Sequence, residues 1–198
     1  MLFSSQVATP IGRLTLLATR EALVAVRFEA HHPLLVLHRA PAIEVKGGDH
    51  AVLAQAEREL HEHFAGERTR FSVPLEPRGT PFQQRVWQEL RAIPYGETRS
   101  YGQLAAAIDQ PTASRAVGAA NGRNPLAIFV PCHRVIGANG ALTGFAGGHE
   151  VKRFLLDLEQ SPAVARAFEP VGAKRPVKGW APWAPPSGRG NGARSPDD

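Results

Sequence analysis

A single cysteine, Cys132, is the strongest constraint on how this chain of 198 residues can fold. One cysteine allows no intrachain disulfide and no zinc site built from several thiolates. The folded state must therefore rest on an apolar core, and a hydrophobic fraction of 43% is enough to build one. The scarcity of cysteine also fits a reducing compartment.

The N-terminal sequence carries no targeting signal that we recognise. In MLFSSQVATPIGRLTLLATR, no basic segment leads into a long apolar run, so we expect no signal peptide. No stretch of the chain approaches the roughly 20 apolar residues that a membrane span needs. We therefore expect a cytoplasmic protein without membrane association.

The first part of the chain is typical of β structure. Residues 2–29 contain apolar runs rich in Val and Leu, broken at Pro10-Ile11-Gly12 and at Arg20-Glu21. Breaks of this kind between strand-forming runs predict a hairpin or a meander. Residues 30–48 hold prolines and a Gly-Gly pair, and we expect them to be irregular.

Helical spacing begins at residue 49. Asp49 is a candidate N-cap and Gly66 a candidate terminator. His61 and His63 are two residues apart, so they point to different faces of this helix and are not expected to bind a metal together. The apolar stripe of the helix consists of Val52, Leu53, Ala56, Leu60 and Phe64.

Proline and glycine mark the predicted domain boundary. The segment RFSVPLEPRGTPF is strand-like at first and then interrupted, and a helix from Pro81 to about Ala92 follows, with Thr80 as its N-cap. We predict an N-terminal domain over residues 1–78 and a second domain over residues 79–160. Residues 160–198 contain seven Pro and five Gly, which is typical of disorder, so residues 161–198 are predicted to be a disordered tail.

Two short helices in the second domain predict a helix-turn-helix. Ser100 is placed to cap a helix that runs to Ile108, and Thr112 is placed to cap another over residues 113–121. The second helix consists almost entirely of small residues, with Arg115 near its start. It is either buried by close packing, or it lies close to a sugar-phosphate backbone.

The net charge of +5 is unevenly distributed. Residues 1–159 carry 17 Lys/Arg against 15 Asp/Glu, whereas residues 99–134 carry four Arg against one Asp. A small basic surface is compatible with a nucleic-acid partner, and equally with an ordinary solvated face.

Cys132 lies beside His133 in the segment FVPCHRVIG. A nucleophilic thiol must lose its proton, and an adjacent imidazole could accept it if both side chains reach one cavity. A third group would then orient the imidazole, and spacing does not choose among the carboxylates of this half. The residues alone leave three alternatives open, namely a buried structural cysteine, a catalytic thiol that turns over, and a thiol consumed in one reaction.

Three longer segments carry a resemblance. GTPFQQRVWQELRAIPYGETRSYGQLA, ASRAVGAANGRNPLAIFVPCHRVIG and GFAGGHEVKRFLLDLE together resemble the O6-alkylguanine-DNA alkyltransferases, over residues 79–159 nearly without gaps. Residues 1–78 are compatible with the more variable N-terminal domain of that family. The resemblance implies an α+β protein, with a small antiparallel, ribonuclease H-like sheet in an N-terminal α/β domain. It further implies a C-terminal helical domain of winged helix-turn-helix type that carries the active site.

The resemblance also implies residue roles at the reaction centre. Cys132 would accept the alkyl group, His133 would act as a water-mediated base, and Glu159 would orient it. Asn124 matches the family's hinge asparagine. Tyr101 would crowd the 3′ phosphate, line the base pocket and protonate the leaving O6 of guanine.

Further residues would bind the substrate. Arg115 matches the arginine that fills the gap left by a flipped nucleotide, at the start of a helix suited to close approach in the minor groove. Backbone groups of Cys132 and Val135 would read the guanine amine, with Phe145 and Ala146 on the opposite side. The remaining DNA-binding candidates are Ala116, Gly118, Ala119 and Arg123.

These roles imply repair by direct reversal, in which one protein molecule irreversibly removes one alkyl group from O6-alkylguanine, or from O4-alkylthymine, in duplex DNA. No cofactor and no metal are implied, and we expect a monomer. A lesion-binding module that recruits other repair factors without transferring the group is the principal alternative, and a thiol hydrolase with turnover is a second one.

Overall fold

The computed structural model describes residues 1–28, 42–45 and 49–160. The predicted disordered tail and most of the segment predicted to be irregular lie outside these residues. Within the described residues, no helix is long and apolar enough to span a bilayer.

The chain begins with an antiparallel meander of three strands, as predicted for residues 2–29. They are β1 Leu2–Thr9, β2 Gly12–Ala18 and β3 Leu23–Phe28. A fourth strand, β4 Ala42–Glu44, pairs in parallel with β1 and gives the order β3-β2-β1-β4. The sheet is therefore mixed at this edge, and β4 corrects the prediction that the whole of residues 30–48 is irregular.

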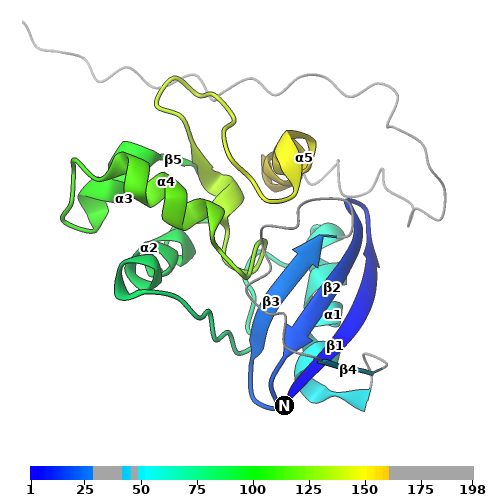
Figure 1. Ribbon diagram of the computed structural model, residues 1–198. Helices are drawn as coiled ribbons and strands as arrows, with labels where there is room; N and C mark the ends of the chain where they lie inside the picture. The colour runs from blue at the N-terminus through cyan, green and yellow to red at the C-terminus, as the bar shows by residue number, and fades with distance from the viewer. Residues whose placement is uncertain (29–41, 46–48, 161–198) are drawn as a thin grey trace, which may run out of the picture.

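Helix α1, Ala51–Phe64, packs against the sheet (Figure 1). All five residues of the predicted apolar stripe are buried. The predicted cap is wrong by one residue, because the side chain of His50, not that of Asp49, accepts from the Leu53 amide. Gly66, in the left-handed region at φ +75, follows the end of the helix as predicted.

The connection from α1 to the second half runs beside β3 without forming a strand. The Leu23 amide donates to Pro74 O at 2.8 Å, and the Glu76 amide donates to Leu23 O at 2.9 Å. The prediction of a strand-like segment is therefore correct only in part, because the segment forms a single β-bridge, between Leu23 and Leu75. Pro74 and Pro77 have no amide hydrogen to donate, so they limit any ladder here.

The second half is helical around a two-stranded parallel pair. Its helices are α2 Pro81–Arg91, α3 Tyr101–Ala107, α4 Ser114–Gly122 and α5 Gly148–Gln160, and its strands are β5 Arg99–Ser100 and β6 Val135–Ile136. Thr80 and Ser100 cap their helices as predicted, each in a capping box with the glutamine three residues later. Thr112 is not a cap, because α4 begins after Ala113, which makes no side-chain capping bond.

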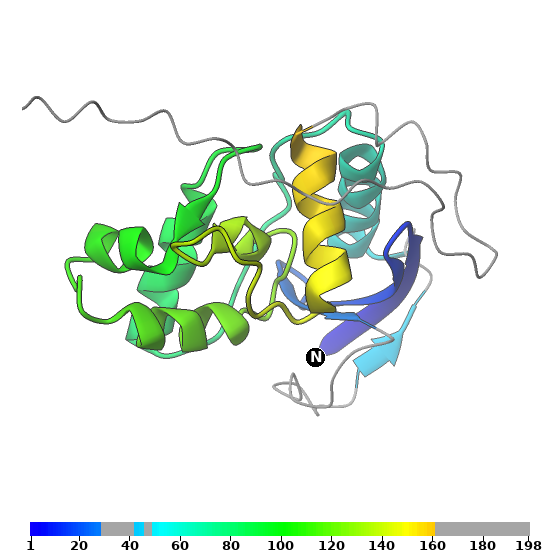
Figure 2. The ribbon, with the colours of Figure 1, turned by 90° about the horizontal axis from the view of Figure 1, so that it is seen from above.

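The two halves share one apolar core. It includes Leu14 and Leu53 from the sheet and α1 and Leu104 and Leu155 from the helical half. Helix α5 lies between α1 and the helices of the second half, as Figure 2 shows, and its Phe154 ring lies 6.4 Å from that of Phe64. The predicted α+β fold is confirmed. In this fold the turn at residues 132–134 packs against α5.

Candidate active site around Cys132

Cys132 begins a single turn of 3-10 helix, Cys132–Arg134, directly after an apolar segment, residues 126–130, that is buried throughout. In such a turn neighbouring side chains diverge by about 120°, whereas neighbours on a strand point to opposite faces. Cys132 itself is only 3% exposed. Cys132 and His133 lie in such a turn, so the rule that neighbours on a strand point to opposite faces does not apply to them.

The thiol is not ionised by its surroundings alone. Burial raises the pKa of Cys132, and a hydrogen bond from Asn124 and the positive charge of Lys152 offset only part of that rise. Since a thiolate is the nucleophilic form, a reaction at this sulfur needs a group that removes the proton.

His133 is held by Glu159 of α5. Its Nε2 lies 2.7 Å from Oε1 of Glu159, and both side chains are fully buried. Burial would raise the pKa of Glu159, but the contributions of His133 and Arg134 outweigh it and lower the pKa to about 2. An ionised carboxylate only accepts hydrogen bonds, so Nε2 carries the ring proton and Nδ1 keeps its lone pair.

The imidazole is neutral and its Nδ1 is available. Burial lowers the pKa of His133, and the attraction of Glu159 offsets this only in part. Nδ1 is buried and has no hydrogen-bond partner among the described residues. This is the arrangement of a general base whose second nitrogen is fixed by a carboxylate.

Arg134 completes the group around Glu159. Its Nε donates to Oε2 at 2.9 Å and its Nη2 to Oε1 at 2.9 Å, while Nη1 donates to Ile93 O at 2.6 Å. The sequence interpretation counted Arg134 with the local basic surface, which is wrong because the side chain is buried in this ion pair.

Lys152 is a functional candidate that the sequence reasoning missed. Its ammonium is buried, donates to Val135 O at 2.5 Å and Thr143 O at 2.6 Å, and has a pKa lowered to about 8 by burial. Lys152 stands three residues before Leu155 and seven before Glu159, so all three share one face of α5. That spacing is the signal from which a buried lysine could have been predicted.

Two asparagines join the end of α4 to the cysteine segment. Asn124 Nδ2 donates to Val130 O at 2.8 Å, and its Oδ1 accepts from the Leu126 amide at 3.0 Å. Asn121 Nδ2, which the sequence reasoning did not single out, lies 3.4 Å from Cys132 O.

The predicted pocket residues come from α3 and the glycine-rich loop before α5. The Tyr101 hydroxyl lies 3.3 Å from Thr143 O, and the Phe145 ring lies 6.3 Å from the His133 ring in an edge-on arrangement. Burial raises the pKa of Tyr101, so its hydroxyl keeps its proton at neutral pH. Ala146 is half-buried, and Val135 is buried on β6 with its carbonyl bonded to Lys152.

Helix α4 presents a face of small residues. Ala116 and Ala119 are exposed and Gly118 is half-buried, whereas Val117 and Ala120 face the core. The alternative of a helix wholly buried by close packing is therefore wrong. Arg115 and Arg123, at either end of the helix, are both exposed.

Comparison with known proteins gives consistent matches over both halves. Residues 2–77 match the model "6-O-methylguanine DNA methyltransferase, ribonuclease-like domain", and residues 81–161 match "6-O-methylguanine DNA methyltransferase, DNA binding domain". The constitutive methylated-DNA–protein-cysteine methyltransferase of Bacillus subtilis is 63% identical over 109 residues, which cover 54% of this chain and 66% of that protein.

Matches from Mycobacterium tuberculosis extend over more of the chain. Its methylated-DNA–protein-cysteine methyltransferase is 49% identical over 167 residues, 83% of this chain and 96% of that protein. The crystal structure of the M. tuberculosis protein OGT in complex with DNA superposes with a TM-score of 0.73 at 45% identity, covering 83% of this chain and 99% of that one.

Proposed function

Because the chain belongs to the 6-O-methylguanine DNA methyltransferase family, we propose that it repairs DNA by moving the alkyl group of O6-alkylguanine onto Cys132. The observation that carries the assignment of the acceptor is the buried pair of Glu159 and His133, the residue that follows Cys132 in the chain. A neutral imidazole with a free Nδ1 supports removal of the thiol proton in a place where burial would otherwise keep it.

The transfer is a displacement at the alkyl carbon. The thiol proton passes to His133 Nδ1, directly or through a water, and the sulfur attacks the carbon as the carbon–O6 bond breaks. The leaving electron pair returns to guanine, and Tyr101, whose raised pKa keeps it protonated, supplies a proton to O6. The proton on His133 then returns to Tyr101 through solvent, so the net change replaces S–H by S–C on the protein and the bond from the alkyl carbon to O6 by a proton on the base.

Lys152 supports the thiolate while it exists. The ammonium is held by two backbone carbonyls, so its position is fixed, and its charge favours the ionised sulfur.

The product limits each molecule to one reaction. A thioether carries no easy leaving group, so the alkylated cysteine persists and the protein is consumed. The same chemistry extends to O4-alkylthymine, which presents an alkyl group on an equivalent exocyclic oxygen.

Duplex DNA is the partner, and the target base must leave the stack to reach a buried thiol. The exposed small residues of α4 support close approach to the minor groove, where sequence readout is weak. Arg115 and Arg123 flank that face; we assign Arg115 to the gap that the extruded nucleotide leaves. The base then lies among Tyr101, the backbone of Cys132 and Val135, and the loop residues Phe145 and Ala146.

The remaining assignments follow from this function. We assign residues 79–160 to DNA binding and alkyl transfer, residues 1–78 to the supporting N-terminal domain, and the tail 161–198 to neither. Asn124 ties the helix-turn-helix to the acceptor segment. We place the protein in the cytoplasm as a monomer.

Intact and peptide mass measurements test the proposal. Incubation with duplex DNA containing O6-methylguanine should add one methyl group in place of one hydrogen, on the peptide that bears Cys132, and the amount should stop at one equivalent. Cys132→Ala should bind the lesion without gaining mass. An unmodified Cys132 in a stable lesion complex would instead identify a lesion-binding module, and product beyond one equivalent would identify a turnover enzyme.

A further inference from the structure

The turn at residues 93–96, before β5, lies against the C-terminal end of α5. Ile93 O accepts from Arg134 Nη1 at 2.6 Å, and the Gly96 amide donates to Glu159 Oε2 at 3.1 Å. The Tyr95 hydroxyl donates to Leu158 O at 3.4 Å. One short turn thus holds both members of the Arg134–Glu159 ion pair and the helix end that carries the carboxylate.

The Tyr95 ring adds a second side-chain contact to this support. The Arg134 guanidinium carbon lies 5.7 Å from the ring centroid, a distance at which a cation is attracted to the aromatic face. Arg134 and Glu159 are buried, whereas Tyr95 is half-buried. Loss of the ring would therefore admit water beside the ion pair and weaken its hold on Glu159.

His63 of α1 fixes the Tyr95 ring from the N-terminal domain. The two rings meet edge to face, with centroids 5.9 Å apart and an interplanar angle of 90°. His63 is buried, its Nδ1 lies 3.1 Å from Arg68 O, and its ring also contacts that of Phe71 at 5.0 Å. Since Arg68 O only accepts, Nδ1 is the donor, and this bond fixes the rotation of the imidazole.

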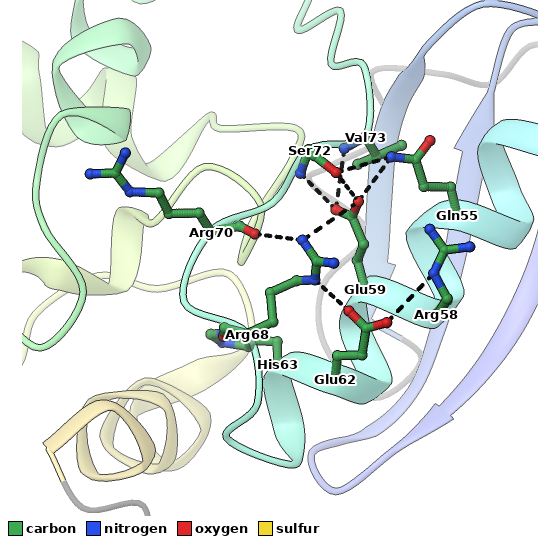
Figure 3. Close-up of polar contacts among 9 residues, drawn as sticks. All are labelled: Gln55, Arg58, Glu59, Glu62, His63, Arg68, Arg70, Ser72 and Val73. Atoms are coloured by element: carbon green, nitrogen blue, oxygen red, sulfur yellow. Dashed lines mark hydrogen bonds and ion pairs between the residues drawn. The ribbon is translucent and has the colours of Figure 1, made fainter.

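The anchor of His63 is itself fixed, as Figure 3 shows. Arg68 Nε donates to Glu62 Oε2 at 2.6 Å, and the buried Glu59 accepts from the amides of Ser72 at 2.8 Å and Val73 at 3.2 Å. The segment that follows α1 is therefore tied to α1 on both sides of Arg70. A continuous set of contacts runs from this segment through His63 and Tyr95 to Glu159.

We propose that Tyr95 is a positioning residue for alkyl transfer, that it acts by holding Glu159 and Arg134 in register with His133, and that His63 makes the N-terminal domain part of this support. The proposal rests on the proposed function, because its effect is measured as reaction at Cys132. Small displacements of a group that orients a base reduce the rate strongly, while the binding of substrate is unaffected.

The test separates reaction from binding with two substrates. Reaction with O6-benzylguanine as the free base gives the maximal inactivation rate, kinact, and the half-saturating concentration, KI. Binding of each variant to a duplex with O6-methylguanine is measured in a protein that also carries Cys132→Ala, and it gives the dissociation constant for the duplex. Tyr95→Leu should lower kinact about tenfold, with KI and duplex affinity within about twofold of wild type. Tyr95→Phe, which keeps the ring, should retain most of kinact.

Two further variants trace the route of the effect. His63→Leu should lower kinact about threefold, and His61→Leu, on the exposed face of the same helix, should leave it unchanged. In a Glu159→Gln background, Tyr95→Leu should have little additional effect on the residual rate, because its route through the carboxylate is already lost.

Several outcomes would overturn the proposal. They are a wild-type kinact in Tyr95→Leu, an equal loss in Tyr95→Phe and Tyr95→Leu, a loss confined to KI or duplex affinity, or full additivity with Glu159→Gln. Failure of the proposed function is distinct, since wild-type protein would then form no benzyl adduct at Cys132.

Discussion

His133 Nε2 lies 2.7 Å from Oε1 of Glu159, in a pair from which solvent is excluded on both sides. This contact fixes the tautomer that leaves Nδ1 free to accept a proton, and it joins the turn at residues 132–134 to a residue of α5 that lies 26 positions further along the chain. Replacement of the carboxylate by an amide should therefore act on the rate of proton removal more than on DNA binding.

We expect Glu159→Gln to lower the rate of methyl transfer by at least about 10²-fold, the usual contribution of an oriented general base. Single-turnover transfer from O6-methylguanine duplex measures it. Glu150→Gln, at the exposed start of the same helix, is the matched control and should react like wild type. Transfer by Glu159→Gln within about twofold of wild type would remove this residue from the mechanism.

Glu159→Gln should also reduce stability, because Arg134 would be left as a buried charge without its carboxylate partner. Breaking such a pair costs about 3–5 kcal/mol of unfolding free energy. Urea unfolding of wild type and Glu159→Gln measures the difference. The double variant Arg134→Met with Glu159→Gln should recover much of the lost stability. A Glu159→Gln protein as stable as wild type would contradict the buried ion pair.

Lys152→Met should slow transfer most strongly below about pH 8. The charge of Lys152 favours the Cys132 thiolate, and its pKa of about 8 means that this charge is present at neutral pH and lost above that value. The ratio of wild-type to variant rate constants for O6-benzylguanine should therefore be largest below pH 8 and fall as the pH rises through it. A ratio that is independent of pH would show that the lysine acts only through the carbonyls it binds.

Local signals allowed much of the fold to be predicted. The apolar runs of the meander, the stripe of α1 and the N-caps Thr80 and Ser100 are all set within a few residues of sequence. Strand β4 was missed because three residues carry no period of their own and pair with a strand some 40 positions away. The N-caps predicted at Asp49 and Thr112 were wrong by one residue each. Residue type alone does not fix the first residue of a helix, which the backbone conformation decides.

The site was predictable only in its outline. The resemblance supplied Cys132, His133 and Glu159, but no pattern placed Arg134 on the carboxylate or the Tyr95 ring against Arg134, since those contacts join three separate segments. Lys152 was overlooked because a lysine is ordinarily exposed, and only its two backbone carbonyl partners make its burial favourable.

Arg115→Ala should impair repair of duplex DNA more than reaction with the free base. Only the duplex requires extrusion of the nucleotide, and the exposed Arg115 is assigned to the gap that extrusion leaves. We expect about a tenfold loss of the transfer rate in duplex, with O6-benzylguanine reacting at the wild-type rate, since a few kcal/mol of unstacking is at stake. Equal losses on the two substrates would remove Arg115 from this role.

His63 should make the stability of the protein depend on pH in mildly acid solution. Burial lowers the pKa of His63 to about 4 from the usual 6.5, so between these values the unfolded chain binds a proton that the folded protein does not. Stability is then lost as the pH falls below 6.5, by about 2 kcal/mol between pH 7 and 5 from this one group. His63→Leu should show a correspondingly weaker fall in urea unfolding at the two pH values, although the similarly buried His133 keeps part of it. His61→Leu should follow wild type, and a His63→Leu protein with the full wild-type dependence would mean that the imidazole is charged within the fold.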